Sequence, residues 1–306
     1  MRTRIVLLGG TELTLAIAER IADHLVGVVW IPSTMRISYS PGGLPNARFA
    51  DVGDWAEARA IATLQWSGIE SLAAFLDGIE SDWGLAAGWY YLLPKRILDR
   101  FPHGCGGVHA SLLPRYRGNA PLNWAILNGE AETGVSLFQM TPGLDDGPLY
   151  GQERIPIGRR TSVADLLEPM RAATLRLVSA AVADLDLGKS ALFPQTGEPC
   201  YGLARLPADG RIGWSDTAEG VDRLVRATTR PYPGAFTHLD GERITIWRGA
   251  PVASAQVFGS HGQIWRLDGR VVVVTGAGLY GIEEATLESG DDALPSLTRS
   301  AHRRLA

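Results

Sequence analysis

The first thirty residues hold the pattern that most restricts the fold. Residues 5–8 are a continuous run of Ile, Val and Leu, and the run ends at Gly9 and Gly10. Thr11 can cap a helix, and the apolar residues after it have the spacing of one helical face. A second apolar run, rich in β-branched residues, occupies 26–31. A buried strand, glycine turn, helix and strand begin a β-α-β unit, so the sequence predicts a mostly parallel sheet with helices on both faces.

The same alternation continues through the first 190 residues. We expect helices at 69–79, 94–101, 122–127 and 162–187, and strands at 83–89, 107–110 and 134–140. Residues 32–52 are rich in Pro, Gly, Ser and Asn and show no periodicity. We expect a long loop there, close to an active-site edge, because loops of that length usually have a function. The sequence therefore predicts an α/β, Rossmann-like domain over residues 1–190.

The composition changes beyond that domain. Pro194, Gly197 and Pro199 give the segment 191–206 the character of a linker. Short apolar runs at 244–247, 263–267 and 271–274 then alternate with glycine-containing turns, as in antiparallel strands. We expect residues 207–306 to form a small β-barrel domain of the OB type.

Charge and cysteine content exclude several classes of protein. The net charge is -4 and the pI is about 5.9, so no global basic field attracts nucleic acid. Cys105 and Cys200 are too few and too far apart for a disulfide framework or a zinc site, and we expect a reducing, cytoplasmic setting. No run reaches the roughly 18 apolar residues that cross a bilayer, so we expect no membrane partner.

Two loops after predicted strands carry the best candidates for chemistry. His109 opens a proline-stiffened turn, and Asp145 and Asp146 lie in a loop bounded by Gly and Pro. A lone histidine is more often structural, and the two aspartates alone are equally well a turn with side-chain hydrogen bonds. Together, however, a carboxylate beside an imidazole orients the ring and makes a proton-transfer pair. Open α/β sheets also bind ligands at the carboxyl edge of their strands.

Several blocks resemble, in order, those of the folate-dependent formyltransferase family. They are Leu93-Pro94-Lys95, His109-x-Ser111-Leu112-Leu113-Pro114-x-x-Arg117-Gly118, Ala120-Pro121, Glu132-Thr133-Gly134-Val135 and Gly143-Leu144-Asp145-x-Gly147. The stretches 205–214 and 231–237 look like that family's junction into its C-terminal barrel. The resemblance covers most of the chain and implies 10-formyltetrahydrofolate as co-substrate, with no metal.

The resemblance also bears on the acceptor. The sequences Gly-Trp-Tyr-Tyr at 88–91 and Pro-Leu-Asn-Trp at 121–124 look most like enzymes that formylate a nucleotide-linked amino sugar, such as UDP-4-amino-4-deoxy-L-arabinose. Methionyl-tRNA formyltransferases usually carry a basic loop near the N-terminus, whereas segment 32–52 holds only Arg36 and Arg48, too few to grip an RNA backbone. Formylation of methionyl-tRNA or of a hydroxyornithine-type amine are the alternatives. The oligomeric state, with a homodimer as one option, stays open.

Roles for single residues follow from the same resemblance. Asp145 is expected to orient His109 and help remove the amine proton, while His109 stabilises the oxyanion and aids proton transfer to the leaving folate nitrogen. The folate pocket is expected to contain Gly88, Trp89, Tyr90, Leu92, Leu93, Leu144 and Asp145. The substrate is expected to contact Ser111, Arg115, Arg117, Gly118 and Asn119.

The chain departs from the family at Gly107, where the family has an asparagine two positions before the histidine. A side-chain amide that donates to an oxyanion contributes about 2.7–4 kcal/mol, and glycine has none to offer. Three interpretations compete: an impaired but folded enzyme, a second amide such as Asn119 in its place, or a paralogue that binds folate or a nucleotide sugar without catalysis. Asn119 is also an ordinary turn residue beside Gly118.

Overall fold

The computed structural model describes residues 2–37, 40–46, 48–253 and 257–306. Its contacts divide the chain into two compact units, each described here by itself. The first contains Met1–Pro121, Glu132–Pro156 and Glu168–Gly202; the second contains Leu122–Ala131, Ile157–Leu167 and Leu203–Ala306. Residues 38–39 and 47, within the expected loop at 32–52, lie outside the described residues.

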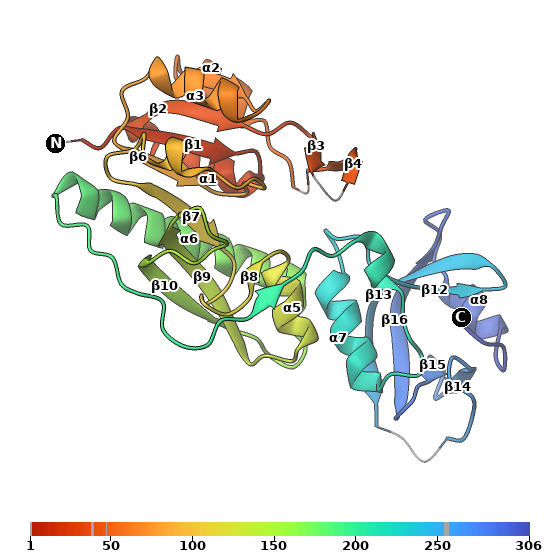
Figure 1. Ribbon diagram of the computed structural model, residues 1–306. Helices are drawn as coiled ribbons and strands as arrows, with labels where there is room; N and C mark the ends of the chain where they lie inside the picture. Colours follow the sequence, from red (N-terminus) through yellow and green to blue (C-terminus); the bar gives the residue numbers. More distant parts are fainter. Residues whose placement is uncertain (1, 38–39, 47, 254–256) are drawn as a thin grey trace. The chain divides into compact units, whose positions relative to one another are not determined.

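The first unit is built on a 7-stranded sheet of order β10-β9-β7-β6-β1-β2-β5 (Figure 1). Its strands are β1 (Ile5–Gly9), β2 (Leu25–Trp30), β5 (Ala62–Gln65), β6 (Trp83–Ala86), β7 (Cys105–His109), β9 (Glu132–Gln139) and β10 (Leu149–Pro156). The pairs β1–β2, β1–β6, β2–β5 and β6–β7 are parallel, whereas β9 runs antiparallel to both β7 and β10. The predicted α/β fold class is confirmed. Strand β10 was not expected, because this edge strand lacks the apolar run of a buried one.

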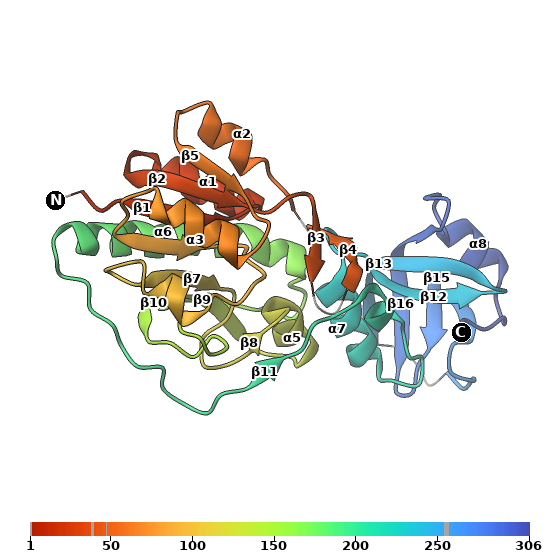
Figure 2. The same cartoon turned by 45° about the horizontal axis from the view of Figure 1, so that its top comes forward.

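Helices cover both faces of this sheet, as Figures 1 and 2 show. One face holds α1 (Glu12–Arg20), α2 (Val52–Glu57) and α6 (Val163–Asp186); the other holds α3 (Ile69–Asp77) and α4 (Lys95–Leu98). The alternation of β1 produces both cores, because Ile5 and Leu7 pack in the first and Val6 and Leu8 in the second. Thr11 caps α1 as expected, its hydroxyl oxygen accepting from the backbone N–H of Thr14.

The segment 32–52 is more ordered than its composition indicates. It contains the antiparallel pair β3 (Thr34–Ile37) and β4 (Ser40–Pro45), so the expectation of a loop without secondary structure was wrong. Strand β4 consists of Ser, Pro, Gly and one Leu and has no apolar alternation, which is the signal that predicts a strand. Asn46 follows it and is buried, and its side-chain amide donates to the carbonyl of Gly10.

The second unit contains a 5-stranded antiparallel sheet of order β12-β13-β16-β15-β14. Its strands are β12 (Ala235–Leu239), β13 (Glu242–Val252), β14 (Ile264–Leu267), β15 (Arg270–Val274) and β16 (Leu279–Leu287). Its helices are α7 (Ala218–Thr228), α8 (Leu294–Arg299) and α5 (Pro121–Leu127), of which the first residue, Pro121, belongs to the first unit. Val221 and Val225 of α7 and Leu297 of α8 share one core with the sheet. The expected antiparallel strands are confirmed. Helix α7 was missed because its apolar positions lie among charged residues.

No helix within the described ranges is long and apolar enough to cross a membrane.

Candidate active site

Two loops of the first unit bring the predicted catalytic residues together. His109 is the last residue of β7, and Asp145 lies in the loop between β9 and β10. Because β9 runs antiparallel to β7, sheet topology alone does not place Asp145 beside His109. The contact depends instead on hydrogen bonds that hold each loop.

The imidazole of His109 has an oxygen near each ring nitrogen. The side chain is buried, and Nε2 lies 2.7 Å from the backbone carbonyl oxygen of Tyr116. A carbonyl only accepts, so Nε2 carries the proton of this hydrogen bond. The other nitrogen, Nδ1, lies 3.5 Å from Oδ2 of Asp145. The ring is therefore fixed by Tyr116 and faces the carboxylate with its second nitrogen.

Asp145 is anchored through both its side chain and its backbone. The backbone N–H of Gly118 donates to Oδ2 of Asp145 at 2.8 Å. The residue adopts a left-handed conformation, with φ of 50°, which is uncommon for a residue other than glycine. The side-chain amide of Gln195 donates at 2.8 Å to the carbonyls of Asp145 and Gly147, on either side of this bend. An imidazole and a carboxylate held in this way can accept and return a proton.

A buried network shapes the turn that follows His109. The Ser136 hydroxyl donates to the carbonyl of Ser111 at 2.6 Å and accepts from the backbone N–H of Leu113 at 3.0 Å. The amide of Gln152 donates to the same hydroxyl and to the Leu113 carbonyl. Ser111 itself is fully buried, and its hydroxyl donates to the carbonyl of Arg115. Ser111, expected to contact substrate, thus has its hydroxyl engaged within the loop.

The remaining residues expected to contact substrate differ in their surroundings. Arg117 donates through Nε and Nη2 to Oε1 of Gln195, at 3.2 and 2.7 Å. Arg115 is exposed, with its guanidinium 5.5 Å from the ring centre of Tyr116. Asn119 is exposed as well. Arg117 is therefore part of the scaffold that holds the Asp145 loop, while Arg115 and Asn119 face solvent.

Gly107 is enclosed by an aromatic side chain. It pairs with Phe138 across the β7–β9 ladder. A Cβ at position 107 would lie 2.8 Å from Cε1 of Phe138, closer than such atoms approach, and a tight 3.0 Å from Cγ of Met140. Phe138 is buried, with Leu113, Leu149 and Met140 around it. A side chain at position 107 would therefore require the ring of Phe138 to shift.

The segment expected to bind folate follows β6 and is partly aromatic. The centroid of the Trp89 ring lies 4.8 Å from the ring centroid of Trp66 and 5.5 Å from that of Tyr91. Burial raises the pKa of Tyr91, more than a hydrogen bond with Trp66 lowers it. Within the part of the chain that the structure describes, the buried indole N–H of Trp89 has no acceptor. This N–H is a donor that a ligand could satisfy.

The other members of this segment divide between surface and core. Leu92 is 63% exposed, whereas Leu93 is 1% exposed and packs in the core under α4. Gly88 has φ of 63°, and a Cβ there would lie 2.5 Å from Oγ1 of Thr11. Tyr90 donates its hydroxyl to Oδ1 of Asn46 at 3.2 Å. The side chain of Leu93 therefore packs in the core beneath this segment and is not exposed to solvent.

Leu144 belongs to the Asp145 loop and is exposed. Its Cδ2 lies 3.6 Å from the point that a Cβ on Gly118 would occupy. The exposed leucine therefore lies next to the turn that follows His109.

Sequence reasoning missed Gln195 and Asn46, which hold the loops around the site. Gln195 lies between Pro194 and Thr196, in a segment whose composition indicates a linker, and a single polar residue there gives no signal. Asn46 likewise lies in a Pro- and Gly-rich stretch. Neither belongs to a periodic pattern, so only the folded contacts reveal them.

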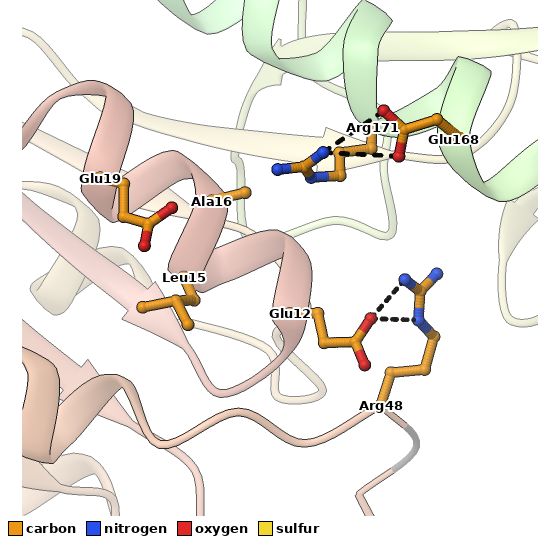
Figure 3. Close-up of a pocket in the computed structure, with 7 residues that line it drawn as sticks. All are labelled: Glu12, Leu15, Ala16, Glu19, Arg48, Glu168 and Arg171. Atoms are coloured by element: carbon orange, nitrogen blue, oxygen red, sulfur yellow. Dashed lines mark hydrogen bonds and ion pairs between the residues drawn. The ribbon is translucent and has the colours of Figure 1, made fainter.

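A pocket of about 290 Å³ lies elsewhere in the first unit, between α1 and α6. It is lined by Glu12, Leu15, Ala16, Glu19, Arg48, Glu168 and Arg171. Figure 3 shows that its arginines are paired, Arg48 with Glu12 and Arg171 with Glu168. None of the predicted site residues lines it. Among the described residues, no group of three or more His, Cys, Asp or Glu side chains is arranged to hold a metal ion.

Comparison with known proteins gives consistent matches over both units. Residues 63–182 match the family model described as Formyl transferase, and residues 206–296 match Formyl transferase, C-terminal domain. A methionyl-tRNA formyltransferase of Sorangium cellulosum (strain So ce56) is 38% identical over 219 residues, which is 71% of this chain and 70% of that protein.

Two solved structures share the fold. The N-formyltransferase from Helicobacter canadensis in complex with folinic acid and dTDP-3-aminofucose has a TM-score of 0.66 and 14% identity, covering 92% of this chain and 98% of that one. HypX from Aquifex aeolicus in complex with tetrahydrofolic acid has a TM-score of 0.62 and 18% identity, covering 95% of this chain. The match spans only 45% of the length of HypX. At these identities the likeness concerns the fold alone.

Proposed function

The chain belongs to the formyl transferase family, and from this premise we propose that it transfers the formyl group of 10-formyltetrahydrofolate to the amino group of a nucleotide-linked amino sugar, with His109 and Asp145 as catalytic residues. That it is a folate-dependent, formyl-transferring enzyme follows from the family. The observation that carries the assignment of residues is the buried imidazole of His109, with Nδ1 3.5 Å from the carboxylate of Asp145.

The proposed reaction moves one carbon between two nitrogens. The amine nitrogen forms a bond to the formyl carbon, the carbonyl oxygen takes up negative charge, and the bond from that carbon to the folate nitrogen then breaks. The amine loses one proton and the folate nitrogen gains one. A carboxylate beside an imidazole supports both transfers, because the pair can accept a proton and return it. The separation of 3.5 Å exceeds a hydrogen bond, and such contacts often shorten when substrate binds.

The proposed roles follow from the hydrogen bonds of the two side chains. Asp145 takes the amine proton. The hydrogen bonds from Gly118 to its carboxylate and from Gln195 to its backbone carbonyl keep the carboxylate on the Nδ1 side of His109. The Nε2 proton of His109 is engaged by Tyr116, so its donation to the oxyanion requires the proton to be shared between two acceptors. The folate is proposed to lie along residues 88–93, where the unpartnered indole N–H of Trp89 offers a hydrogen bond.

Two observations support a small acceptor over an RNA. The net charge of the chain is -4, and the guanidinium of Arg48 in the segment 32–52 is paired with Glu12. An RNA backbone needs several unengaged cations. The second candidate is methionyl-tRNA, which is favoured by the relative of that name at 38% identity.

The test is release of tetrahydrofolate from 10-formyltetrahydrofolate with a panel of amines. We expect release with at least one nucleotide-linked amino sugar, and His109→Ala should reduce the rate by about 10²- to 10⁴-fold. Release only with methionyl-tRNA, with an affinity that falls steeply as salt rises, would select the second candidate. Undiminished turnover by His109→Ala would exclude the catalytic assignment.

A further inference from the structure

We propose that Gln195 is a positioning residue for formyl transfer, which sets the distance between His109 and Asp145; this inference rests on the proposed function. Gln195 lies outside both catalytic loops, in the segment between α6 and the second unit. Its side-chain hydrogen bonds go to Arg117 and to two backbone carbonyls rather than to the His109 ring or the Asp145 carboxylate. Its effect on the reaction therefore has to pass through the backbone of the Asp145 loop.

The side chain of Gln195 connects the two loops directly. Its Nε2 donates at 2.8 Å to the carbonyls of Asp145 and Gly147. Its Oε1 accepts from Nη2 of Arg117, at 2.7 Å, in the turn after His109. The amide group of Gln195 thus donates twice to the loop that contains Asp145 and accepts from the turn that follows His109. The backbone of Asp145 is left-handed, with φ of 50°, and the two hydrogen bonds from Gln195 hold the carbonyls of Asp145 and Gly147 at this bend.

The flanking segment reinforces this arrangement at both ends. Phe193 exchanges two backbone hydrogen bonds with Leu149, at the start of β10. At the other end β11 (Tyr201–Gly202) pairs in parallel with β8 (Arg117–Gly118), and Gly118 donates to the carboxylate of Asp145. The segment from 193 to 202 is therefore hydrogen-bonded to β10 on one side of Gln195 and to β8 on the other, and these bonds fix the position of the Gln195 side chain.

The same segment also supports the partner of His109. The backbone N–H of Tyr116 lies 3.1 Å from Sγ of Cys200, and the carbonyl of Tyr116 accepts from His109. Both members of the catalytic pair are thus held from one stretch of chain. Gln195 is the side chain in it that bridges the two loops, and its loss should let the carboxylate move away from the imidazole.

The test compares Gln195→Met with the unchanged chain. Methionine has a similar length but has no donor for the two carbonyls and offers Arg117 only a weak sulfur acceptor. We expect kcat to fall about 10- to 100-fold, because a misplacement of about 1 Å is enough for such a loss, while KM for the acceptor amine changes little. Crystal structures of both proteins should show a longer distance from Nδ1 of His109 to Oδ2 of Asp145 in the variant. A merely structural role would lower stability without moving this distance.

A matched control is Gln263→Met in the second unit, where the side-chain oxygen accepts from the backbone N–H of Ser260. This control should leave kcat unchanged. If Gln195→Met does not fold, Gln195→Glu keeps an acceptor for Arg117 and replaces the two donors with a carboxylate oxygen, which cannot donate to the two carbonyls. Should either Gln195 variant keep both its kcat and the original distance, the inference is wrong. If the unchanged chain formylates no amine, the proposed function fails, and the distance still decides whether Gln195 positions the pair.

Discussion

Phe138 lies directly opposite Gly107 across the β7–β9 ladder and fills the space above its Cα. Position 107, two residues before His109, therefore has no room for a side chain unless Phe138 shifts. An aromatic ring packed over a glycine on an adjacent strand covers backbone that would otherwise lack a side-chain contact. Gly107 and Phe138 are thus parts of one packing arrangement.

The first prediction concerns the asparagine that the family resemblance implies at position 107. Gly107→Asn should lower the free energy of unfolding by about 1–3 kcal/mol, because its Cβ overlaps the Phe138 ring. The double variant Gly107→Asn, Phe138→Ala should lose less than the sum of the two single variants, since removal of the ring makes room for the amide. Urea denaturation of all four proteins measures this coupling.

The same set of proteins tests catalysis. If a missing oxyanion donor limits the rate, the double variant should gain about 10²- to 10³-fold in kcat over Phe138→Ala alone. An unaltered stability for Gly107→Asn alone would contradict the steric argument. A double variant with no gain in rate would show that the asparagine is not what this site lacks.

The second prediction concerns the carboxylate. Asp145→Asn keeps the size of the side chain and an oxygen that can accept from the N–H of Gly118, but it removes the charge and the base. We expect kcat to fall by about 10²- to 10⁴-fold while the melting temperature changes little. Asp146→Asn is the matched control, because Asp146 is exposed and its Oδ1 accepts from Thr141 within the loop. Equal losses in both variants would mean that the loop, not the Asp145 carboxylate, matters.

The sequence predicts those parts of the fold that depend on local patterns. The run at 5–8, the cap at Thr11 and the second apolar strand determine the sheet core and its two helical faces, and the structure has them all. Strand β4 was missed because it has neither a continuous apolar run nor an apolar alternation. Helix α7 was missed although Val221 and Val225 are spaced for one helical face and Thr217 caps the helix, because charged residues separate the apolar ones.

The candidate site divides in the same way. His109 and Asp145 could be proposed from sequence because each lies in a distinctive block of residues. The supports of the pair could not, because Gln195 is 50 residues from Asp145 and 78 from Arg117 in sequence. The consequence of Phe138 for Gly107 was equally invisible, since it depends on the β7–β9 register.

The third prediction concerns the indole of Trp89. Trp89→Phe keeps an aromatic ring against Trp66 but removes the buried N–H that has no acceptor among the described residues. If folate accepts this hydrogen bond, the affinity for 5-formyltetrahydrofolate should fall about two- to tenfold, as a bond of about 0.5–1.5 kcal/mol requires. Calorimetric titration measures it, with Trp265→Phe in the second unit as control. An unchanged affinity would place the folate away from this N–H.

The last prediction concerns stability in acid. Asp186, at the end of α6, accepts from the imidazole of His24 at 3.0 Å and from the backbone N–H of Thr3 at 2.7 Å. Burial raises the pKa of this carboxyl, but these hydrogen bonds outweigh it and lower the pKa from 3.8 to about 2. Since the folded-state pKa is depressed, the stabilisation is present above the unfolded pKa and is lost as the pH falls through the folded one.

Asp186→Asn should therefore be less stable than the unchanged chain at pH 5, by about 1 kcal/mol given the partial exposure of the carboxyl, and the difference should shrink between pH 4 and pH 2. Urea denaturation at several pH values measures both curves. A gap that stays constant down to pH 2 would show that the charge of Asp186 does not contribute. Because these two hydrogen bonds join Thr3, which precedes β1, and His24, which precedes β2, to the end of α6, their loss in acid should loosen one end of the sheet core before the buried network around Ser136.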